Sequence, residues 1–309
     1  MNTAMFYHEA GLDHDTGPGH PERSDRLRAV MAALEDEAFQ MLDRRPAPLA
    51  ELEQIIRVHP EDFVTNLLDR MPQDGHRMVD GDTVMSPGTR EAALRSAGAA
   101  VAGVDAVFRG EARNAFCAMR PPGHHAERHR AMGFCFFNNA AVAAAHARAV
   151  HGIERVAVID FDVHHGNGTQ DIAWSDRDFL YASTHQMPLF PGTGAASETG
   201  DFNTIVNVPL KAGAAGPDFL AALRESILPR IEMFKPDLVL VSAGFDAHRR
   251  DPLAGLSLEA RDYAEATRWI LDTADSVCAG RVVSVLEGGY DLEGLASSCS
   301  AHVRELMAG

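Results

Sequence analysis

The chain has 309 residues, 46% of them hydrophobic, and a formal net charge of -16. This content can bury one large core, and the acidic balance without a basic stripe argues against nucleic-acid binding. No apolar run reaches the roughly 18 residues that a membrane span needs, and the amino terminus lacks the regions of a signal peptide. The four cysteines form no CxxC pair, so free thiols are expected. We therefore expect a cytoplasmic protein that binds neither nucleic acid nor membrane; the sequence carries no signal for or against an oligomer.

The first third of the chain is predicted to be mainly helical. Ser24 has the character of an N-cap, and apolar residues recur after it at helical spacing up to Leu42. Pro46 and Pro48 end this segment. The polar residues 72–88 predict a loop. In chain order, we expect a strand at 3–7 and helices at 24–42, 61–71 and 89–109.

From residue 114 onward, apolar runs typical of strands alternate with helical segments. Strands are expected at 114–119, 155–160, 179–183, 204–208, 237–242 and 281–286. Helices are expected at 138–151, 218–234, 257–277 and 292–307. Such alternation favours a parallel sheet covered by helices on both faces. Without a repeat or a boundary in composition, residues 1–309 are predicted to form a single α/β domain.

One predicted strand leads directly into residues that can bind a metal. The apolar run up to Ile159 is followed by Asp160, Asp162 and His164 at alternating positions. Alternate side chains share one face of an extended chain, and buried charges without partners are costly. A divalent metal is the simplest partner, and oxygen and nitrogen donors together suit zinc.

Three further predicted strands also end in reactive residues. They lead into the segments 120–125, 242–246 and 287–290, which carry His124, His125, Asp246 and Tyr290. Open parallel sheets bind ligands at the carboxyl edge of their strands. We therefore expect all four segments to contribute to one site.

Long motifs in these segments make the chain resemble the histone deacetylase family. The motifs are HPERSDRLRAV at 20–30, RPPGHHA at 120–126, GFCFFNN at 133–139, DFDVHHGNGT at 160–169, SAGFDAH at 242–248 and LEGGYD at 286–291. The likeness covers almost the whole chain and is greatest to class II and bacterial deacetylase-like amidohydrolases, which include acetylpolyamine amidohydrolases. It implies the arginase/deacetylase fold, in which helices flank a central parallel sheet on both faces.

The resemblance also implies a catalytic zinc site. Its ligands would be Asp162, His164 and Asp246, which leaves a position open for water and substrate. Asp160 would not bind the metal but would lie behind His124, where it fixes the tautomer of the imidazole and raises its basicity.

The catalytic roles implied for the other side chains are those of an amide hydrolase. The resemblance favours His125 as the general base and His124 as electrostatic support, although the residues alone do not decide between them. Asn167 follows where class I enzymes carry Asp, so His125 is expected to be less basic. Tyr290 would donate a hydrogen bond to the oxyanion of the tetrahedral intermediate, and weakly active family members carry His at this position.

A narrow substrate tunnel and a potassium site complete the implied features. Gly133, Phe134 and Phe190 would form the tunnel walls around an acyl-lysine stem. Leu253 occupies a position where polyamine-selective relatives carry Glu. The residues implied at the potassium site are Asp160, Asp162, His164, Ser183 and Thr184.

Several functions remain open. The leading hypothesis is zinc-dependent hydrolysis of an acyl-lysine peptide or an acylated small amine, with release of acetate; Leu253 disfavours an acetylpolyamine, although the acidic loop 74–82 offers another acid. Arginase-like chemistry with two manganese ions needs more bridging carboxylates than Asp246 provides. A non-catalytic acyl-lysine binding module would not need the histidine pair or Tyr290. The acyl length and the metal used in the cell, with Fe(II) as an alternative, also stay open.

Overall fold

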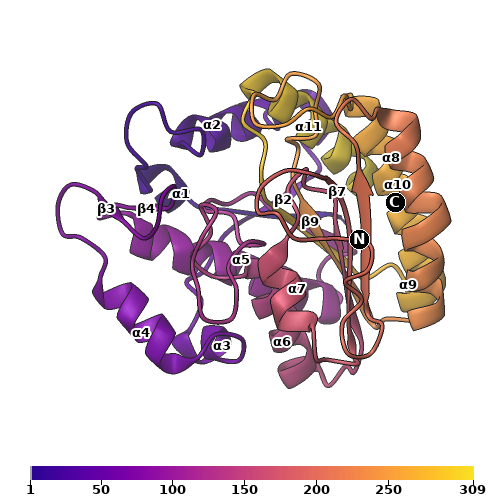
Figure 1. The fold of residues 1–309 in the computed structure, drawn as a ribbon, viewed down its shortest axis with the longest axis horizontal. Helices are drawn as coiled ribbons and strands as arrows, with labels where there is room; N and C mark the ends of the chain where they lie inside the picture. The colour runs from indigo at the N-terminus through magenta and orange to yellow at the C-terminus, as the bar shows by residue number, and fades with distance from the viewer. Residues whose placement is uncertain (1) are drawn as a thin grey trace.

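The centre of the structure is an eight-stranded sheet with helices on both faces (Figure 1). The computed structural model describes residues 2–309. The strand order is β2-β1-β5-β10-β9-β6-β7-β8, and every neighbouring pair is parallel. The strands are β1 (Ala4–Tyr7), β2 (Asp43–Pro46), β5 (Asn114–Cys117), β6 (Val156–Asp160), β7 (Phe179–Gln186), β8 (Ile205–Leu210), β9 (Leu238–Ala243) and β10 (Val282–Leu286). The predicted architecture, one α/β domain with a parallel sheet covered by helices on both faces, is confirmed.

Two apolar clusters, one on each face of the sheet, hold the helices in place. In β6, Val156 and Val158 belong to the cluster beneath α5 and α6, whereas Ala157 and Ile159 belong to the cluster beneath α2 and α8–α11. A strand buried on both faces needs apolar residues at every position, which explains its continuous hydrophobic run. The helices are α1 (Ala10–Asp13), α2 (Ser24–Ala33), α3 (Leu52–Ile56), α4 (Glu61–Asp69), α5 (Thr89–Phe108), α6 (Asn139–His151), α7 (Asn167–Ala173), α8 (Gly216–Ala222), α9 (Leu228–Phe234), α10 (Ala260–Cys278) and α11 (Leu292–Ala308).

The amino-terminal third differs most from the prediction. The expected helix over 24–42 ends at Ala33, with Ser24 as its first residue rather than its cap, and a short 3-10 turn follows at Glu37–Phe39. The chain then forms the edge strand β2, which the sequence did not predict. The strand has the sequence Asp-Arg-Arg-Pro and only one paired neighbour, so it carries no apolar pattern, and its pairing with β1 is what makes it a strand.

Two smaller differences concern the segments 72–88 and 218–234. The segment 72–88, expected as a loop, contains a two-stranded antiparallel hairpin, β3 (Arg77–Met78) and β4 (Val84–Met85). The helix expected over 218–234 is interrupted by a π-helical turn at Leu223–Ile227, which ends two residues before Pro229, a residue that cannot donate a backbone hydrogen bond. No helix within residues 2–309 is both long enough and apolar enough to cross a membrane.

The order of the strands brings the reactive segments together. The strands β5, β10, β9 and β6 are consecutive neighbours in the middle of the sheet. Because they are parallel, their carboxyl ends lie at one edge, and the loops that follow them meet there. The predicted gathering of the four segments is therefore a consequence of the sheet order.

Candidate active site

Three buried side chains converge at the carboxyl ends of β6 and β9. Asp162 and His164 follow β6, and Asp246 follows β9. The Nδ1 atom of His164 lies 3.0 Å from Oδ2 of Asp246 and 3.2 Å from Oδ1 of Asp162. Among the described residues, only histidines form ion pairs with these two carboxylates; no lysine or arginine does.

The chemistry of this group fits a divalent cation. Backbone amides bind the outer oxygens, Gly288 donating to Asp162 Oδ2 and Val163 to Asp246 Oδ1, each at 2.8 Å. Burial, and then the charge of Asp162, raises the pKa of Asp246 to about 7, so the two acids destabilise each other unless a cation lies between them. A Cβ at Gly288 would lie 2.2 Å from Asp246 Oδ2, so only glycine lets the chain approach so closely. One nitrogen and two oxygen donors suit zinc.

The first histidine of the pair contacts two carboxylates. His124 Nδ1 lies 3.0 Å from Asp160 Oδ2, which also accepts a hydrogen bond from the Tyr181 hydroxyl at 3.0 Å. Burial opposes charge on His124, but the nearby Asp162 and Asp160 outweigh it and hold the pKa of this imidazole well above its usual range. The geometry therefore favours a positively charged His124.

The second histidine of the pair, His125, has a lowered pKa and favours the neutral form. His125 Nδ1 lies 2.8 Å from Asn167 Oδ1, and Asn167 Nδ2 donates to Glu127 at 2.8 Å. This network assigns the proton to Nδ1 of His125 and leaves Nε2 as a free acceptor. Burial, and then the neighbouring imidazoles His124 and His164, lowers the pKa of His125 well below 6.5. The pair thus combines a charged and a neutral imidazole.

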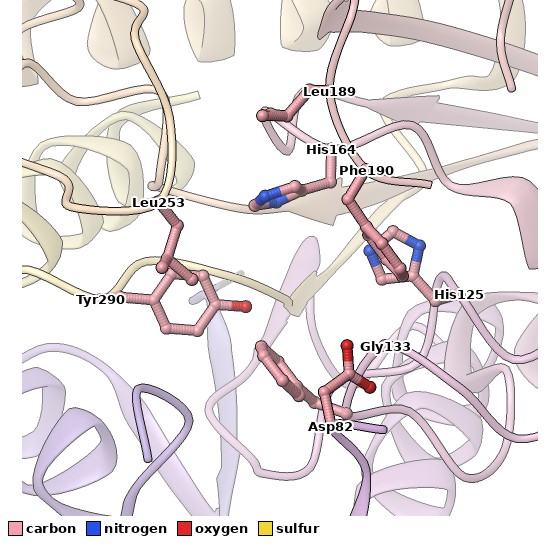
Figure 2. Close-up of a pocket in the computed structure, with 9 residues that line it drawn as sticks. Asp82, His125, Gly133, His164, Leu189, Phe190, Leu253 and Tyr290 are labelled. Atoms are coloured by element: carbon pink, nitrogen blue, oxygen red, sulfur yellow. The ribbon is translucent and has the colours of Figure 1, made fainter. Parts of the chain in front are cut away.

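A cavity of about 230 Å³ opens above these groups (Figure 2). Figure 2 shows the Tyr290 hydroxyl pointing into the same space as the His125 and His164 rings. The lining residues are Asp82, His125, Gly133, Phe134, His164, Leu189, Phe190, Leu253 and Tyr290. Every residue predicted for the tunnel and for the oxyanion contact therefore faces one cavity.

The cavity wall depends on an unusual backbone conformation. Gly133 has φ 56°, and a Cβ there would lie 2.6 Å from the His125 ring. Phe134 also has a positive φ, 69°, which is costly for an aromatic residue and is typical of functional sites. The Phe190 ring lies edge-on to His125 at 5.1 Å and is 41% exposed, so it lies at the rim of the cavity.

Several supporting residues were missed by reasoning from the sequence. Glu287 is buried and accepts hydrogen bonds from the backbone amides of Gly123 at 2.7 Å and His124 at 3.1 Å. Burial raises the pKa of Glu287 to about 7. Glu287 lies in the LEGGYD motif, but its role depends on contact with Gly123, 164 positions earlier in the chain, which the motif does not reveal.

The Tyr290 loop is held from two further sides. Asp251 accepts a hydrogen bond from the Tyr290 amide at 2.7 Å. The guanidinium of Arg26 lies 4.9 Å from the centre of the Tyr290 ring and donates to the carbonyl of Gly289 at 2.6 Å. These contacts fix the direction of the phenol, and neither residue was singled out for such a role from the sequence.

Asp82 is the acid of the loop 72–88 that reaches the cavity. Burial, and then repulsion from Asp80, raises the pKa of Asp82.

The residues predicted for a potassium site also lie close together, since Asp160 pairs with Ser183 in the register of β6 and β7 and Thr184 follows Ser183. That second cation remains a prediction.

The fold and the site together define an α/β protein of the arginase/deacetylase type, with a candidate metal-binding cluster beneath a histidine pair. Residues 20–306 match the histone deacetylase domain, and the chain belongs to the histone deacetylase family. It is 40% identical to a probable deacetylase of Archaeoglobus fulgidus, covering 100% of this chain and 87% of that protein. It is 39% identical to the histone deacetylase-like amidohydrolase of Pseudomonas aeruginosa, covering 99% of this chain and 86% of that protein.

A solved structure has the same fold over the whole chain. The crystal structure of the HDA15 HD domain matches with a TM-score of 0.92 and 35% identity, covering 100% of this chain and 89% of that one. The family assignment made from the motifs is thus confirmed both by sequence and by fold.

Proposed function

We propose that this protein is a zinc-dependent amidohydrolase, with residues 1–309 acting as one catalytic domain. It would remove an acetyl or related acyl group from an acyl-lysine peptide or an acylated small amine and release acetate. The observation that carries this proposal is the convergence of Asp162, His164 and Asp246 beneath a cavity into which a neutral imidazole and a phenol also point.

Each side chain has a role that follows from its contacts. When bound to the three ligands, zinc would supply a Lewis acid that polarises the acyl carbonyl and acidifies a water molecule. His125 would accept the proton of the attacking water at Nε2, because Asn167 keeps its Nδ1 proton in place. His125 would then return this proton to the leaving amine.

Two groups would stabilise the negative charge that develops on the substrate. The Tyr290 hydroxyl would donate a hydrogen bond to the oxyanion, with its direction set by Asp251 and Arg26. His124, which the carboxylate of Asp160 favours in its charged form, would add a fixed positive charge beneath the reacting centre. Both groups are in position before the reaction, so little reorganisation is needed.

The lining of the cavity favours a substrate that has a narrow, uncharged stem. Gly133, Phe134, Phe190 and Leu253 give walls that suit an alkyl chain and exclude water. This favours acyl-lysine, whose charge is removed by acylation. Asp82 at the same cavity could instead attract the free ammonium of an acetylated polyamine, so that substrate is the second candidate.

The test is a hydrolysis assay of an acetyl-lysine peptide beside acetylputrescine, with and without a hydroxamate chelator. We expect acetate release from the peptide, and loss of activity with the chelator. A strong preference for acetylputrescine, reduced in an Asp82→Asn variant through a higher KM, would reverse the ranking of substrates. Turnover that persists after complete removal of metal would contradict the zinc-dependent mechanism.

A further inference from the structure

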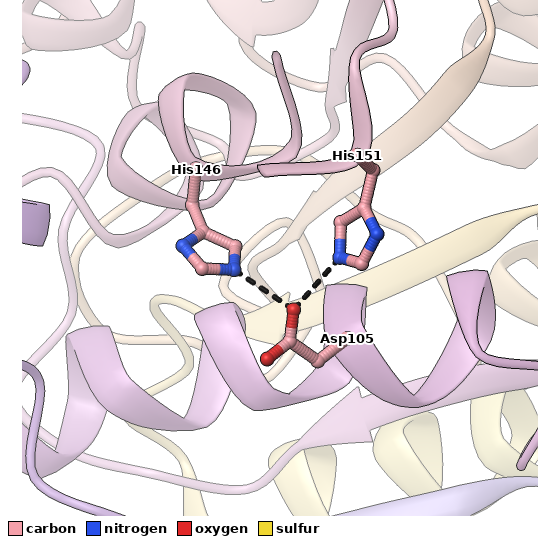
Figure 3. A group of neighbouring side chains, drawn as sticks. All are labelled: Asp105, His146 and His151. Atoms are coloured by element: carbon pink, nitrogen blue, oxygen red, sulfur yellow. Dashed lines mark hydrogen bonds and ion pairs between the residues drawn. The ribbon is translucent and has the colours of Figure 1, made fainter. Parts of the chain in front are cut away.

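A second group of possible metal ligands lies away from the candidate active site. Asp105 lies in the last turn of α5, and His146 and His151 lie near the end of α6. Figure 3 shows the two imidazoles on either side of the carboxylate. Oδ1 of Asp105 lies 2.8 Å from His146 Nε2 and 2.7 Å from His151 Nε2.

We propose that Asp105, His146 and His151 bind a divalent transition metal of the zinc type. One donor atom from each residue lies within 4.8 Å of the other two, as in the cluster at the candidate active site. Two imidazole nitrogens and one carboxylate oxygen suit zinc, cobalt or nickel rather than magnesium or calcium, which prefer oxygen ligands alone.

The cluster can open enough to admit an ion. Bonds of about 2.0–2.2 Å to one tetrahedral zinc place its donor atoms roughly 3.3 Å apart, about half an ångström more than the two distances from Asp105 to the histidines. His151 is the last residue of α6, its side chain is 14% exposed, and Gly152 with φ 65° follows it. A side chain at the end of a helix can make this small movement, and water can complete the coordination from the exposed side.

The electrostatic environment favours a cation at this point. The carboxyl ends of both helices contribute partial negative charge. Although burial opposes charge on Asp105, hydrogen bonds from the two histidines lower the pKa of its carboxyl group. A carboxylate in the last turn of a helix is unfavourable by itself, and a bound cation would offset that repulsion.

Two arginines near the cluster lower its affinity for a metal but leave the metal-binding atoms accessible. Arg109 binds Oδ2 of Asp105 at 3.1 Å, so Oδ1 remains for the metal. Arg57 lies 3.3 Å from His146 Nδ1, which must carry a proton when Nε2 binds metal. Arg57 also binds the exposed Glu53 at 2.8 Å and can keep this contact while turning away from the imidazole.

The position of the cluster separates it from catalysis. Helix α6 begins beside the active-site loop, where the amide of Asn139 lies close to Gly123, and ends just before β6. Helix α5 likewise ends just before β5. The cluster therefore lies at the amino edge of the sheet, opposite the candidate active site, and its metal would join two helices rather than act on substrate.

Zinc stoichiometry tests the proposal. The metal-free full chain is titrated with Zn²⁺ by calorimetry, and bound zinc is counted after gel filtration. We expect two zinc ions per chain in the wild type, one in His151→Ala, and two in the control His129→Ala, which alters an exposed histidine outside both clusters. Deacetylation of the acetyl-lysine peptide should be equal in all three.

The outcomes separate this proposal from the proposed function. A wild type with one zinc ion that His151→Ala retains would overturn the second site, as would two ions in His151→Ala. A single ion that His151→Ala removes would instead contradict the catalytic zinc. If His151→Ala does not fold, Asp105→Asn takes its place, and Co²⁺ added to the metal-free chain should give visible absorption bands that reach full intensity at two equivalents in the wild type and at one in Asp105→Asn.

Discussion

Replacing Asn167 by aspartate tests the role of His125 directly. The two side chains are buried, and His125 Nδ1 lies 2.8 Å from Asn167 Oδ1. A carboxylate there would bring a negative charge about 4 Å from the imidazolium charge, an attraction of about 4 kcal/mol at an effective dielectric constant of about 20. This corresponds to about three pKa units. Desolvation of the new carboxylate opposes it, so we expect the pKa of His125 to rise by about 1–2 units.

The sign of the effect on activity follows from the role of the base. A higher pKa keeps His125 protonated over more of the acidic range, and a protonated imidazole cannot accept the proton of the attacking water. The acid limb of the pH profile of kcat/KM should therefore move up by about 1–2 pH units, and activity on that limb should fall about tenfold or more, with little change on the plateau near pH 7.

Glu127 supplies the matched control. Its carboxylate lies 2.8 Å from Asn167 Nδ2, so the single variant Asn167→Asp would place two acids in contact. In the double variant Asn167→Asp/Glu127→Gln, the new glutamine amide can donate to the aspartate and keep it charged. The shift of the acid limb should be larger in the double variant, whereas Glu127→Gln alone should shift it little.

The assay is kcat/KM for the acetyl-lysine peptide from about pH 5 to about pH 9, with metal content measured for every variant. An acid limb that does not move, in a double variant with full metal content and measurable turnover, would refute the assignment of His125 as the base. It would point to His124 instead, because its own partner Asp160 is unchanged.

Three further predictions concern the oxyanion contact, the cavity wall and the core. Tyr290→Phe should keep its metal and lose about 10²–10³ in kcat, since one oxyanion donor is removed; unchanged turnover would exclude Tyr290 from the mechanism. Leu253→Glu should improve kcat/KM for acetylputrescine relative to the peptide by up to about fivefold, the size of a partly solvated ion pair, and an equal ratio would argue against an ammonium near this wall. His302 is buried between Thr267 and Ser284, and burial lowers its pKa to about 3. Below about pH 6.5 the unfolded chain binds a proton that the folded chain excludes, so the free energy of unfolding should fall by about 1.4 kcal/mol per pH unit from this residue. Urea unfolding at pH 7 and pH 5 should show a loss about 2 kcal/mol smaller in His302→Asn than in the wild type, and equal losses would contradict the linkage.

The residues of the candidate site could be found from the sequence because each belongs to a local pattern. Asp160, Asp162 and His164 follow an apolar strand, and strand ends in a parallel sheet share one edge whatever the details of packing. The motifs around His125 and Tyr290 are contiguous, so they too can be recognised from the sequence alone.

Other features depend on partners that are distant in the sequence, and only the tertiary structure decides them. Strand β2 exists because β1 accepts its backbone hydrogen bonds, a pairing that its own polar residues do not encode. Glu287 and Arg26 support the site through contacts with loops more than a hundred positions away.

The same distinction applies to the second metal cluster. No motif in the sequence singles out His146 and His151, because Asp105 lies on another helix and only the packing of α5 against α6 brings it to them. The sequence thus determined the buried strands, the reactive residues that follow them and the family, since these depend on local periodicity and contiguous motifs. The tertiary structure decided which distant side chains share a hydrogen bond or could share a metal, because such contacts depend on how the elements pack.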